Sequence, residues 1–340
     1  MEGPRHHASR ARELCSRVLV EAANRRHSGL DRSALYAEVA ADLAAWGAGE
    51  RAPLEGTVAK ELEGFSDAEV FEFARRMSGT GASWGFHAHD PVARRLSRLA
   101  QNRVLLAGSK LEASEELSRA RKGPVFFVAN HLSYVDANVL DALIVAAGFG
   151  QVADRLTVLA GPKVYSTATR RLASLCFGSI KIPQSQSIAS EEAVMPRREV
   201  ARLAEQTLRA VAERHAAGEH VTIFIEGTRS RTGGMQRVLA ASARYFETEG
   251  ATILPIGLWG TERLVPLDTM QVTPGQVHAR AGRPIAAAEL SERAGGRRPV
   301  IADALGFLIA DLLPPSYRGT YGEVTPALES ARAAAAAFSP

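Results

Sequence analysis

The fold is decided by the stretch Val125-Phe126-Phe127-Val128-Ala129-Asn130-His131-Leu132-Ser133-Tyr134-Val135-Asp136. Its first five residues are β-branched, aromatic or small, and Gly123-Pro124 precedes them, which predicts a buried strand. Ser133 and Asp136 then form a capping box that opens an amphipathic helix. His131 therefore lies in a strand-to-helix turn, where open α/β sheets carry their chemistry.

A second stretch repeats this plan, with the apolar run Val221–Ile225 followed by Glu226-Gly227-Thr228-Arg229. Glycine lets the backbone approach a ligand closely, and an arginine offers a planar fork of donors for a phosphate or carboxylate. Arg231 follows two residues later, and both arginines also fit ordinary surface ion pairs. Two such turns at the ends of two strands predict a single site.

Asn130-His131 with Asp136, followed about ninety residues later by Phe224-Ile225-Glu226-Gly227-Thr228-Arg229, resembles the glycerophospholipid acyltransferase family. That family includes the lysophosphatidate and glycerol-3-phosphate acyltransferases. Lys163 with Gly178-Ser179-Ile180-Lys181-Ile182 looks like its second motif, and Ile253-Leu254-Pro255-Ile256-Gly257 looks like its fourth. The similarity spans roughly residues 100 to 322.

The resemblance assigns roles to individual residues. His131 is expected to act as general base, with Asp136 bonded to the other ring nitrogen to fix the tautomer. The expected acceptor-phosphate residues are Glu226, Gly227, Thr228, Arg229, Lys163 and Lys181. Arg229 is their charged contact, and Glu226 shapes the turn rather than touching the anion. Asn130, Ser133 and Pro255 are expected to shape the site or to lie on the acyl-donor side.

The second motif departs from the family pattern. Relatives commonly carry an arginine after the Gly-x-Ile-x-Ile pattern, whereas this chain has Gln184 after Pro183. Lys181 or Lys163 would then supply a point charge in place of a bidentate fork.

The reaction implied is acyl transfer from a thioester of coenzyme A or acyl carrier protein to a hydroxyl of a glycerol-phosphate acceptor. The preferred reaction converts lysophosphatidate to phosphatidate in phospholipid biosynthesis, and glycerol-3-phosphate 1-O-acylation is the alternative. No further cofactor is expected. Outside this class, Gly81-Ala82-Ser83-Trp84-Gly85 matches the serine-hydrolase pattern but follows a predicted helix instead of a strand. A catalytically silent lipid-binding module is the other alternative.

Composition narrows the classes of function. Two cysteines far apart in sequence, Cys15 and Cys176, argue against a disulfide framework. His6, His7, His131 and Asp136 lack metal-ligand spacing, so we expect no metal. The net charge of +4 suits phosphorylated substrates and an anionic membrane surface, and no nucleic-acid-binding motif is visible. With no segment of roughly eighteen apolar residues, a cytoplasmic protein attached peripherally to the membrane is expected.

Hydrophobic periodicity predicts three regions. Residues 1–88 form a helical region, residues 89–322 a catalytic domain and residues 323–340 a flexible tail. In the first region, arginines including Arg17, Arg25 and Arg26 flank the stripe of Leu14, Val18 and Leu19, which fits either interfacial binding or ordinary packing. The catalytic domain is expected to be a mostly open mixed α/β sheet covered by helices. Its expected strands lie near 103–107, 125–129, 156–160, 179–182, 221–225, 252–257 and 276–281, and its expected helices near 112–121, 134–147, 164–175, 191–217, 236–248 and 298–313.

Overall fold

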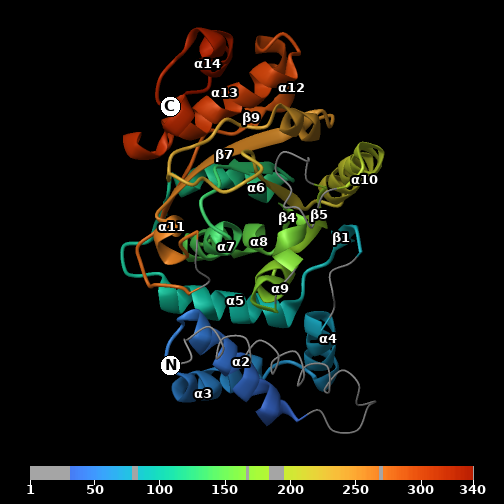
Figure 1. Ribbon diagram of the computed structural model, residues 1–340, viewed down its shortest axis with the longest axis vertical. Coiled ribbons are helices and arrows are strands. Elements are labelled where there is room, and N and C mark those ends of the chain that lie inside the picture. The colour runs from blue at the N-terminus through green and yellow to red at the C-terminus, as the bar shows by residue number, and fades with distance from the viewer. Residues whose placement is uncertain (1–30, 79–82, 166–167, 184–194, 268–270, 340) are drawn as a thin grey trace, which may run out of the picture.

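The computed structural model describes residues 31–78, 83–165, 168–183, 195–267 and 271–339. These residues contain one mixed nine-stranded sheet in the order β1-β5-β4-β6-β3-β7-β8-β2, with β9 paired to β7. The strands are β1 Gly85–His87, β2 Lys110–Glu112, β3 Phe126–Ala129, β4 Leu156–Ala160, β5 Gly178–Lys181, β6 His220–Phe224, β7 Thr252–Trp259, β8 His278–Ala281 and β9 Ile285–Ala286. The predicted class, an open mixed sheet covered by helices with a helical N-terminal region, is confirmed (Figure 1).

Helices cover both faces of the sheet and build the N-terminal region (Figure 1). The α-helices are α2 Arg32–Trp46, α3 Arg51–Leu62, α4 Asp67–Ser78, α5 Pro91–Val104, α6 Ser118–Lys122, α7 Asp136–Ala146, α8 Gly150–Ala153, α9 Ala168–Leu175, α10 Arg197–Ala216, α11 Thr261–Leu264, α12 Ala287–Arg293, α13 Arg298–Asp311 and α14 Glu329–Ala335. Among the residues described, none of these helices is both long enough and apolar enough to cross a bilayer.

Strand β3 lies between β6 and β7 and is parallel to both. In this register Ala129, the last residue of β3, is opposite Phe224 of β6 and Ile256 of β7. Parallel strands end at the same edge of a sheet, so the turns that follow β3 and β6 begin beside each other. The two motifs found in the sequence therefore meet at this edge.

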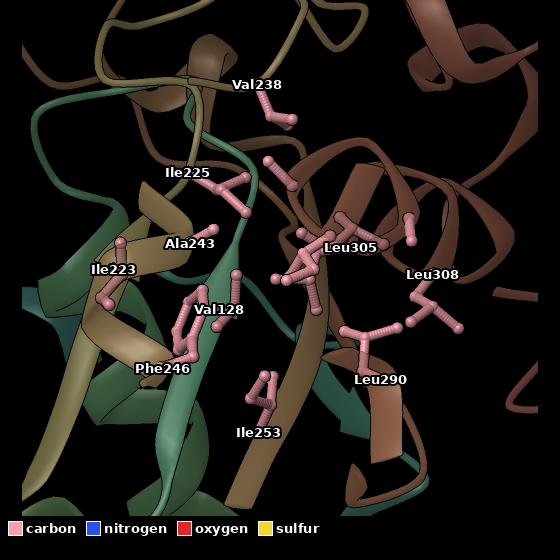
Figure 2. Close-up of a cluster of buried hydrophobic side chains, with 14 of the residues drawn as sticks. Val128, Ile223, Ile225, Val238, Ala243, Phe246, Ile253, Leu290, Leu305 and Leu308 are labelled. Atoms are coloured by element: carbon pink, nitrogen blue, oxygen red, sulfur yellow. The ribbon is translucent and has the colours of Figure 1, made fainter. Parts of the chain in front are cut away.

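Strand β3 forms because its side chains are buried on both faces of the sheet, as its continuous apolar run predicts. Phe126 and Val128 point into the core below α10, α12 and α13, where Figure 2 shows Val128 among Ile223, Ile253 and Leu305. Phe127 and Ala129 point into the opposite core below α7 and α8. Burying each of the larger side chains stabilises the fold by about 1.5–3 kcal/mol, so both layers hold the strand in register.

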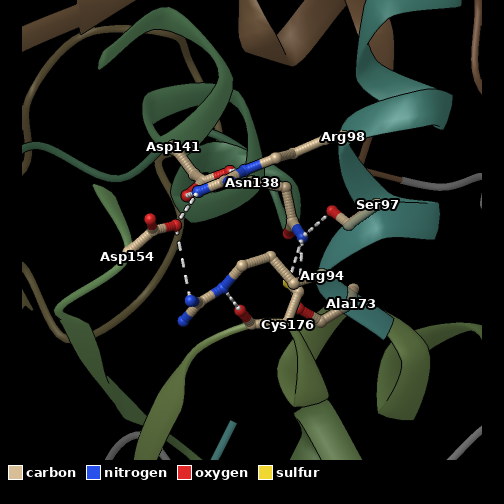
Figure 3. Close-up of polar contacts among 8 residues, drawn as sticks. All are labelled: Arg94, Ser97, Arg98, Asn138, Asp141, Asp154, Ala173 and Cys176. Atoms are coloured by element: carbon tan, nitrogen blue, oxygen red, sulfur yellow. Dashed lines mark hydrogen bonds and ion pairs between the residues drawn. The ribbon is translucent and has the colours of Figure 1, made fainter. Parts of the chain in front are cut away.

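Helix α5 contacts the N-terminal helices on one side and helices that cover the sheet on the other. Val92, Leu96 and Ala100 pack with α2, α3 and α4 in a third apolar cluster. The other side of α5 makes polar contacts with α7 and with Asp154, the residue after α8 (Figure 3). The Arg98 guanidinium donates to both Asp141 oxygens at 2.9 Å and to Asp154 at 2.9 Å. The N-terminal helices are thus joined to the sheet through α5, while the domain boundary near residue 88 remains a prediction.

Several predicted elements differ from the structure. No strand covers 103–107, because Val104 continues the helical stripe of α5 and the adjoining edge strand is β2 instead. The helix expected at 236–248 is a 3₁₀ helix over Ala240–Phe246, and the short strand β1, which begins at Gly85, is not among the expected strands. Such short elements carry too few residues for a periodic pattern to show.

Residues 323–339, which belong to the predicted C-terminal tail, pack against α13 through α14. Ala331, Ala334 and Ala335 are buried, and the Phe338 ring is also buried. The Arg332 guanidinium donates to the Asp311 carboxylate at 2.6 Å. An alanine run shows no amphipathic stripe in the sequence, yet its small side chains let two helices approach closely.

Candidate active site

His131 lies two residues after the end of β3, and its imidazole lies beside the carboxylate of Asp136, the first residue of α7. The distance from His131 Nδ1 to Asp136 Oδ2 is 2.8 Å, with 19% of the histidine side chain exposed and the aspartate fully buried. The imidazole also stacks on the Phe224 ring, with the centroids 4.6 Å apart. A carboxylate at Nδ1 favours the tautomer with its proton there, which leaves Nε2 as the basic nitrogen.

Asp136 is fixed by three further hydrogen bonds. Its Oδ2 accepts from the backbone N–H groups of Leu132 at 2.7 Å and Ser133 at 3.0 Å, and its Oδ1 accepts from the Thr261 hydroxyl at 2.5 Å. The Ser133 hydroxyl donates to the Val265 carbonyl at 3.3 Å instead of capping α7. The predicted capping box is therefore wrong for Ser133, because Asp136 itself closes the turn and the helix begins at that residue.

Glu226 ties the two turns together. Its Oε1 accepts from the His131 backbone N–H at 2.8 Å, and its Oε2 accepts from the Gln236 N–H at 2.7 Å. The Ser230 N–H donates to the His131 carbonyl at 2.7 Å. Burial raises the pKa of Glu226 to about 7, although the two backbone donors act in the opposite direction. Glu226 thus holds the backbone of His131 and lies outside the pocket lining.

Asn130 joins β3 to β7 at the same edge. Its side-chain amide donates to the Leu258 carbonyl and accepts from the Leu258 N–H, both at 2.8 Å. Pro255 is buried in β7 opposite Val128. Neither Asn130 nor Pro255 lines the pocket, so both are placed to shape the site from behind.

A pocket of about 600 Å³ lies where the turns meet, a size that suits a small-molecule ligand. The polar part of its wall includes His131, Gly227 and Thr228. Gly227 has a φ of 69°, a left-handed conformation that glycine adopts without strain. The apolar part of the wall is formed by Trp46, Val135, Val158, Leu159, Phe177 and Leu267.

Four cationic side chains, Lys163, Arg170, Arg229 and Arg231, also line the pocket. No aspartate or glutamate is among the described residues that line it. Arg229 Nη1 is buried and has no hydrogen-bond partner among the described residues. A buried guanidinium nitrogen without an acceptor is costly, so this wall of the pocket suits an anionic ligand.

Lys181 lies elsewhere. Its ammonium is 4.6 Å from the centroid of the Trp84 ring and 5.5 Å from that of Tyr165, and it does not line the pocket. Burial lowers the pKa of Lys181. Of the two lysines suggested by the second motif, Lys163 is the one on the pocket wall.

Ser83, at the centre of the serine-hydrolase pattern, precedes the edge strand β1 instead of following a strand. A nucleophile elbow requires a strand-to-helix turn, so this pattern carries no hydrolase geometry. Within the described part of the chain, no three histidine, cysteine, aspartate or glutamate side chains gather into a group that could hold a metal. His6, His7 and Cys15 lie outside the described residues.

Comparison with known proteins identifies the class. The sequence profile of the Acyltransferase family matches residues 109–259, which include His131, Asp136, Glu226 and Arg229. No curated protein sequence matches the chain.

Among solved structures, the chain is similar to the 1-acyl-sn-glycerophosphate (LPA) acyltransferase PlsC from Thermotoga maritima. The identity is 18% and the TM-score 0.46, over 83% of this chain and 97% of that chain. The resemblance drawn from the two motifs is confirmed by the family match. The chain is therefore an enzyme that carries an acyltransferase domain at residues 109–259.

Proposed function

We propose that this enzyme moves a fatty acyl group from an acyl thioester to a hydroxyl of a glycerol-phosphate acceptor, with lysophosphatidate as the preferred acceptor. The observation that carries the proposal is one pocket that joins the His131 imidazole, an apolar wall, and a cationic wall with no carboxylate among its described residues. These three features match the hydroxyl to be activated, the acceptor phosphate and the acyl chain.

In the proposed reaction, Nε2 of His131 takes the proton of the acceptor hydroxyl as its oxygen attacks the thioester carbonyl carbon. The imidazolium that forms is stabilised by Asp136, 2.8 Å from Nδ1. The tetrahedral intermediate collapses with cleavage of the C–S bond. The thiolate that leaves takes the proton from the His131 imidazolium, which returns the base to its neutral form. Thiols ionise near pH 8.5, so this leaving group needs little acid assistance, and no covalent enzyme intermediate is required.

The acceptor phosphate is proposed to bind at Arg229, with Lys163 as a second charge. Arg229 supports this role because its Nη1 is buried without an acceptor among the described residues, and a phosphate oxygen would supply one. The Gln236 side chain donates to the Arg229 carbonyl at 2.9 Å, which holds the backbone of this residue.

The donor carrier is proposed to be coenzyme A or acyl carrier protein, and no other cofactor is invoked. Because a lipid acceptor resides in a bilayer, the enzyme is proposed to act at the surface of an anionic membrane. The basic stripe predicted within residues 1–30 lies outside the described residues, so this part of the proposal rests on the sequence.

The test is an acyl-transfer assay with purified enzyme, labelled acyl-CoA or acyl-acyl carrier protein, and a panel of acceptors. The panel contains lysophosphatidate, glycerol 3-phosphate and lysophosphatidylglycerol. We expect labelled phosphatidate as the main product. If glycerol 3-phosphate alone is acylated, the first-position reaction replaces the preferred one. If no glycerol-phosphate acceptor is acylated with either donor, the proposed function is wrong.

A further inference from the structure

The segment Pro315–Tyr321, which follows α13 as two short 3₁₀ turns, packs against the turn after β6. The Tyr317 carbonyl accepts from the Met235 N–H at 2.9 Å, and the Met235 carbonyl accepts from the Thr320 N–H at 2.9 Å. These two reciprocal bonds fix the backbone of Met235. The segment lies beyond residues 109–259, which match the family profile, so the contact is made from outside the matched domain.

The close approach of the two backbones depends on glycine. Gly319 has a φ of 49°, in the left-handed region, and a Cβ atom at this position would overlap the Met235 carbonyl oxygen. On the opposite side, a Cβ atom at Gly234 would lie 3.0 Å from the Gly319 Cα. The packing therefore leaves no room for a side chain on either strand of this contact.

The backbone contact leads to His131 in two steps. Gln236, the residue after Met235, donates its N–H to Glu226 Oε2 at 2.7 Å. The other oxygen of Glu226 accepts from the His131 N–H at 2.8 Å. Fixing Met235 thus fixes the donor that orients the Glu226 carboxyl, which in turn holds the backbone of His131.

The side chain of Tyr317 leads to Asp136 by a separate route. Its hydroxyl donates to Glu262 Oε1 at 2.6 Å, and Glu262 Oε2 accepts from the Gly260 N–H at 3.0 Å. Thr261 lies between these two residues and is fully buried. Its hydroxyl donates to Asp136 Oδ1 at 2.5 Å. The Tyr317 hydroxyl therefore holds the short segment that supplies a donor to Asp136.

Tyr317 is well suited to this place. Its ring packs against the core between the sheet and α13. Burial, together with the Glu262 carboxylate, raises the pKa of Tyr317 to about 12, so its hydroxyl stays protonated and donates at neutral pH. A hydrogen bond to a charged acceptor is stronger than one between neutral groups. Neither Tyr317 nor Glu262 is among the described residues that line the pocket.

We propose that Tyr317 is a positioning residue for the pair His131 and Asp136, since its carbonyl supports the backbone of the histidine and its hydroxyl supports the carboxylate of the aspartate. This inference rests on the proposed function, in which that pair forms the general base. Catalysis by a positioned base depends steeply on its orientation. Loss of the support should therefore lower kcat, and the KM values should stay because Tyr317 does not line the pocket.

The first test is Tyr317→Phe, which removes the hydroxyl and keeps the backbone bonds to Met235. It should lower kcat about tenfold, less than the roughly 100-fold that a misplacement of about 1 Å costs. The KM values for lysophosphatidate and for the acyl donor should stay within about twofold of the wild type. A rise in either KM with unchanged kcat would overturn the proposal.

A double variant shows whether the hydroxyl acts through Thr261. Thr261→Val keeps the shape of the side chain and removes its bond to Asp136. In that background Tyr317→Phe should lower kcat by less than about twofold further, because the route to Asp136 is already cut. Its effect on the unfolding temperature should persist in both backgrounds. If the two effects on kcat simply multiply, the hydroxyl has only a structural role and the proposal is wrong.

The backbone route is tested with Gly319→Ala, which should also lower kcat while the KM values stay. The matched control is Gly250→Ala, because Gly250 has a φ of 70° but no atom within 4 Å of the place of a Cβ atom. This control carries the same kind of backbone strain without the overlap and should keep kcat. An equal fall of kcat in the two variants would exclude a specific backbone route. If Gly319→Ala does not fold, Tyr317→Phe and the double variant decide.

The control for the lost hydroxyl is Tyr36→Phe on α2, where the hydroxyl accepts from the Arg32 guanidinium at 3.3 Å. It removes a comparable bond to a charged group away from the pocket lining and should keep kcat. If the wild type acylates its acceptor and Tyr317→Phe reacts equally fast, the positioning role is wrong and the proposed function stands. If the wild type acylates no glycerol-phosphate acceptor, the proposed function itself fails.

Discussion

At the scale of single residues, the site depends on how His131 is held. Asp136 orients its imidazole, Glu226 holds its backbone N–H, and the Phe224 ring supports its face. Together these contacts hold the ring nitrogen, the backbone and the ring face of His131. The imidazole is therefore oriented before any substrate binds, which is the condition for efficient general-base catalysis.

His131→Ala removes the proposed base, and we expect turnover to fall by about 10²- to 10⁴-fold with little change in the unfolding temperature. Steady-state kinetics with acyl-CoA and lysophosphatidate measure the effect. Ser83→Ala is the control, since Ser83 lies outside the pocket lining, and it should react like the wild type. Turnover near the wild-type value in His131→Ala would exclude the mechanism.

Glu226→Gln tests the buried carboxyl through the pH dependence of stability. Its folded-state pKa of about 7 is above the ordinary value of 4.5, so the folded protein binds the proton more tightly than the unfolded chain. The resulting stabilisation is full below pH 4.5 and is lost as the pH rises through 7, by roughly 3 kcal/mol in total.

Urea unfolding of the wild type and Glu226→Gln between pH 4.5 and 8.5 measures this difference. The free energy of unfolding of the wild type should fall relative to that of the variant as the pH rises. A lost backbone hydrogen bond in the variant adds only a constant offset. Parallel curves for the two proteins would show that Glu226 is ionised throughout this range.

At the scale of elements, helix α5 is the link between the N-terminal helices and the sheet. Arg98 and Arg95 lie on this same helix but differ in their surroundings. The Arg98 side chain is 24% exposed and bonds to Asp141, whose side chain is 4% exposed. The Arg95 side chain is 56% exposed, with Glu61 at 3.4 Å.

Arg98→Ala leaves the buried Asp141 carboxylate without its partner, and we expect it to lower the free energy of unfolding by about 3–5 kcal/mol. Arg95→Ala, on the same helix, should change it by less than about 1 kcal/mol because exposed ion pairs contribute little. Chemical denaturation of both variants measures the contrast. Equal and small losses would mean that α5 is held by its apolar contacts alone.

At the scale of the whole molecule, the N-terminal helices contribute to the pocket itself. Trp46, the last residue of α2, lines the pocket with residues that follow β3 and β4. Its carbonyl also accepts from the Val272 N–H at 2.9 Å, which fixes the end of α2 against the segment before β8. The helical region therefore helps to set the size of the proposed acyl site.

Trp46→Ala would enlarge the apolar part of the pocket. We expect the preferred donor to shift towards longer acyl chains, measured as kcat/KM over a series of acyl-CoA chain lengths. The KM for the acceptor should stay within about twofold of the wild-type value, since Trp46 carries no charge. An unchanged chain-length profile in a folded variant would place the acyl chain elsewhere.

The proposed attachment to a membrane surface is also tested on the whole chain. If the predicted stripe near Leu14 binds an anionic surface, cosedimentation with vesicles should require anionic lipid and weaken as salt rises, because salt screens each attraction of about 1 kcal/mol. Replacing Arg17, Arg25 and Arg26 with Glu should reduce it further. Equal binding to neutral vesicles, or full binding after deletion of residues 1–30, would assign the contact to another surface.

The sequence by itself determined the parts of this protein that are local in the chain. The run Val125–Ala129 predicts a buried strand because apolar periodicity is a local property, and β3 confirms it. His131 and Asp136 are five positions apart, so a single tight turn brings them together. The pairing of the two motifs also predicted the class of enzyme correctly.

Only the tertiary structure decided which distant side chains share the site. Thr261 reaches Asp136 across 125 positions, and nothing in the local sequence around either residue indicates that contact. Lys181 and Lys163 both fitted the charge pattern, yet strand β5 directs Lys181 to the aromatic rings of Trp84 and Tyr165. The physical reason is that sheet order and loop geometry place side chains, and both result from packing over the whole chain.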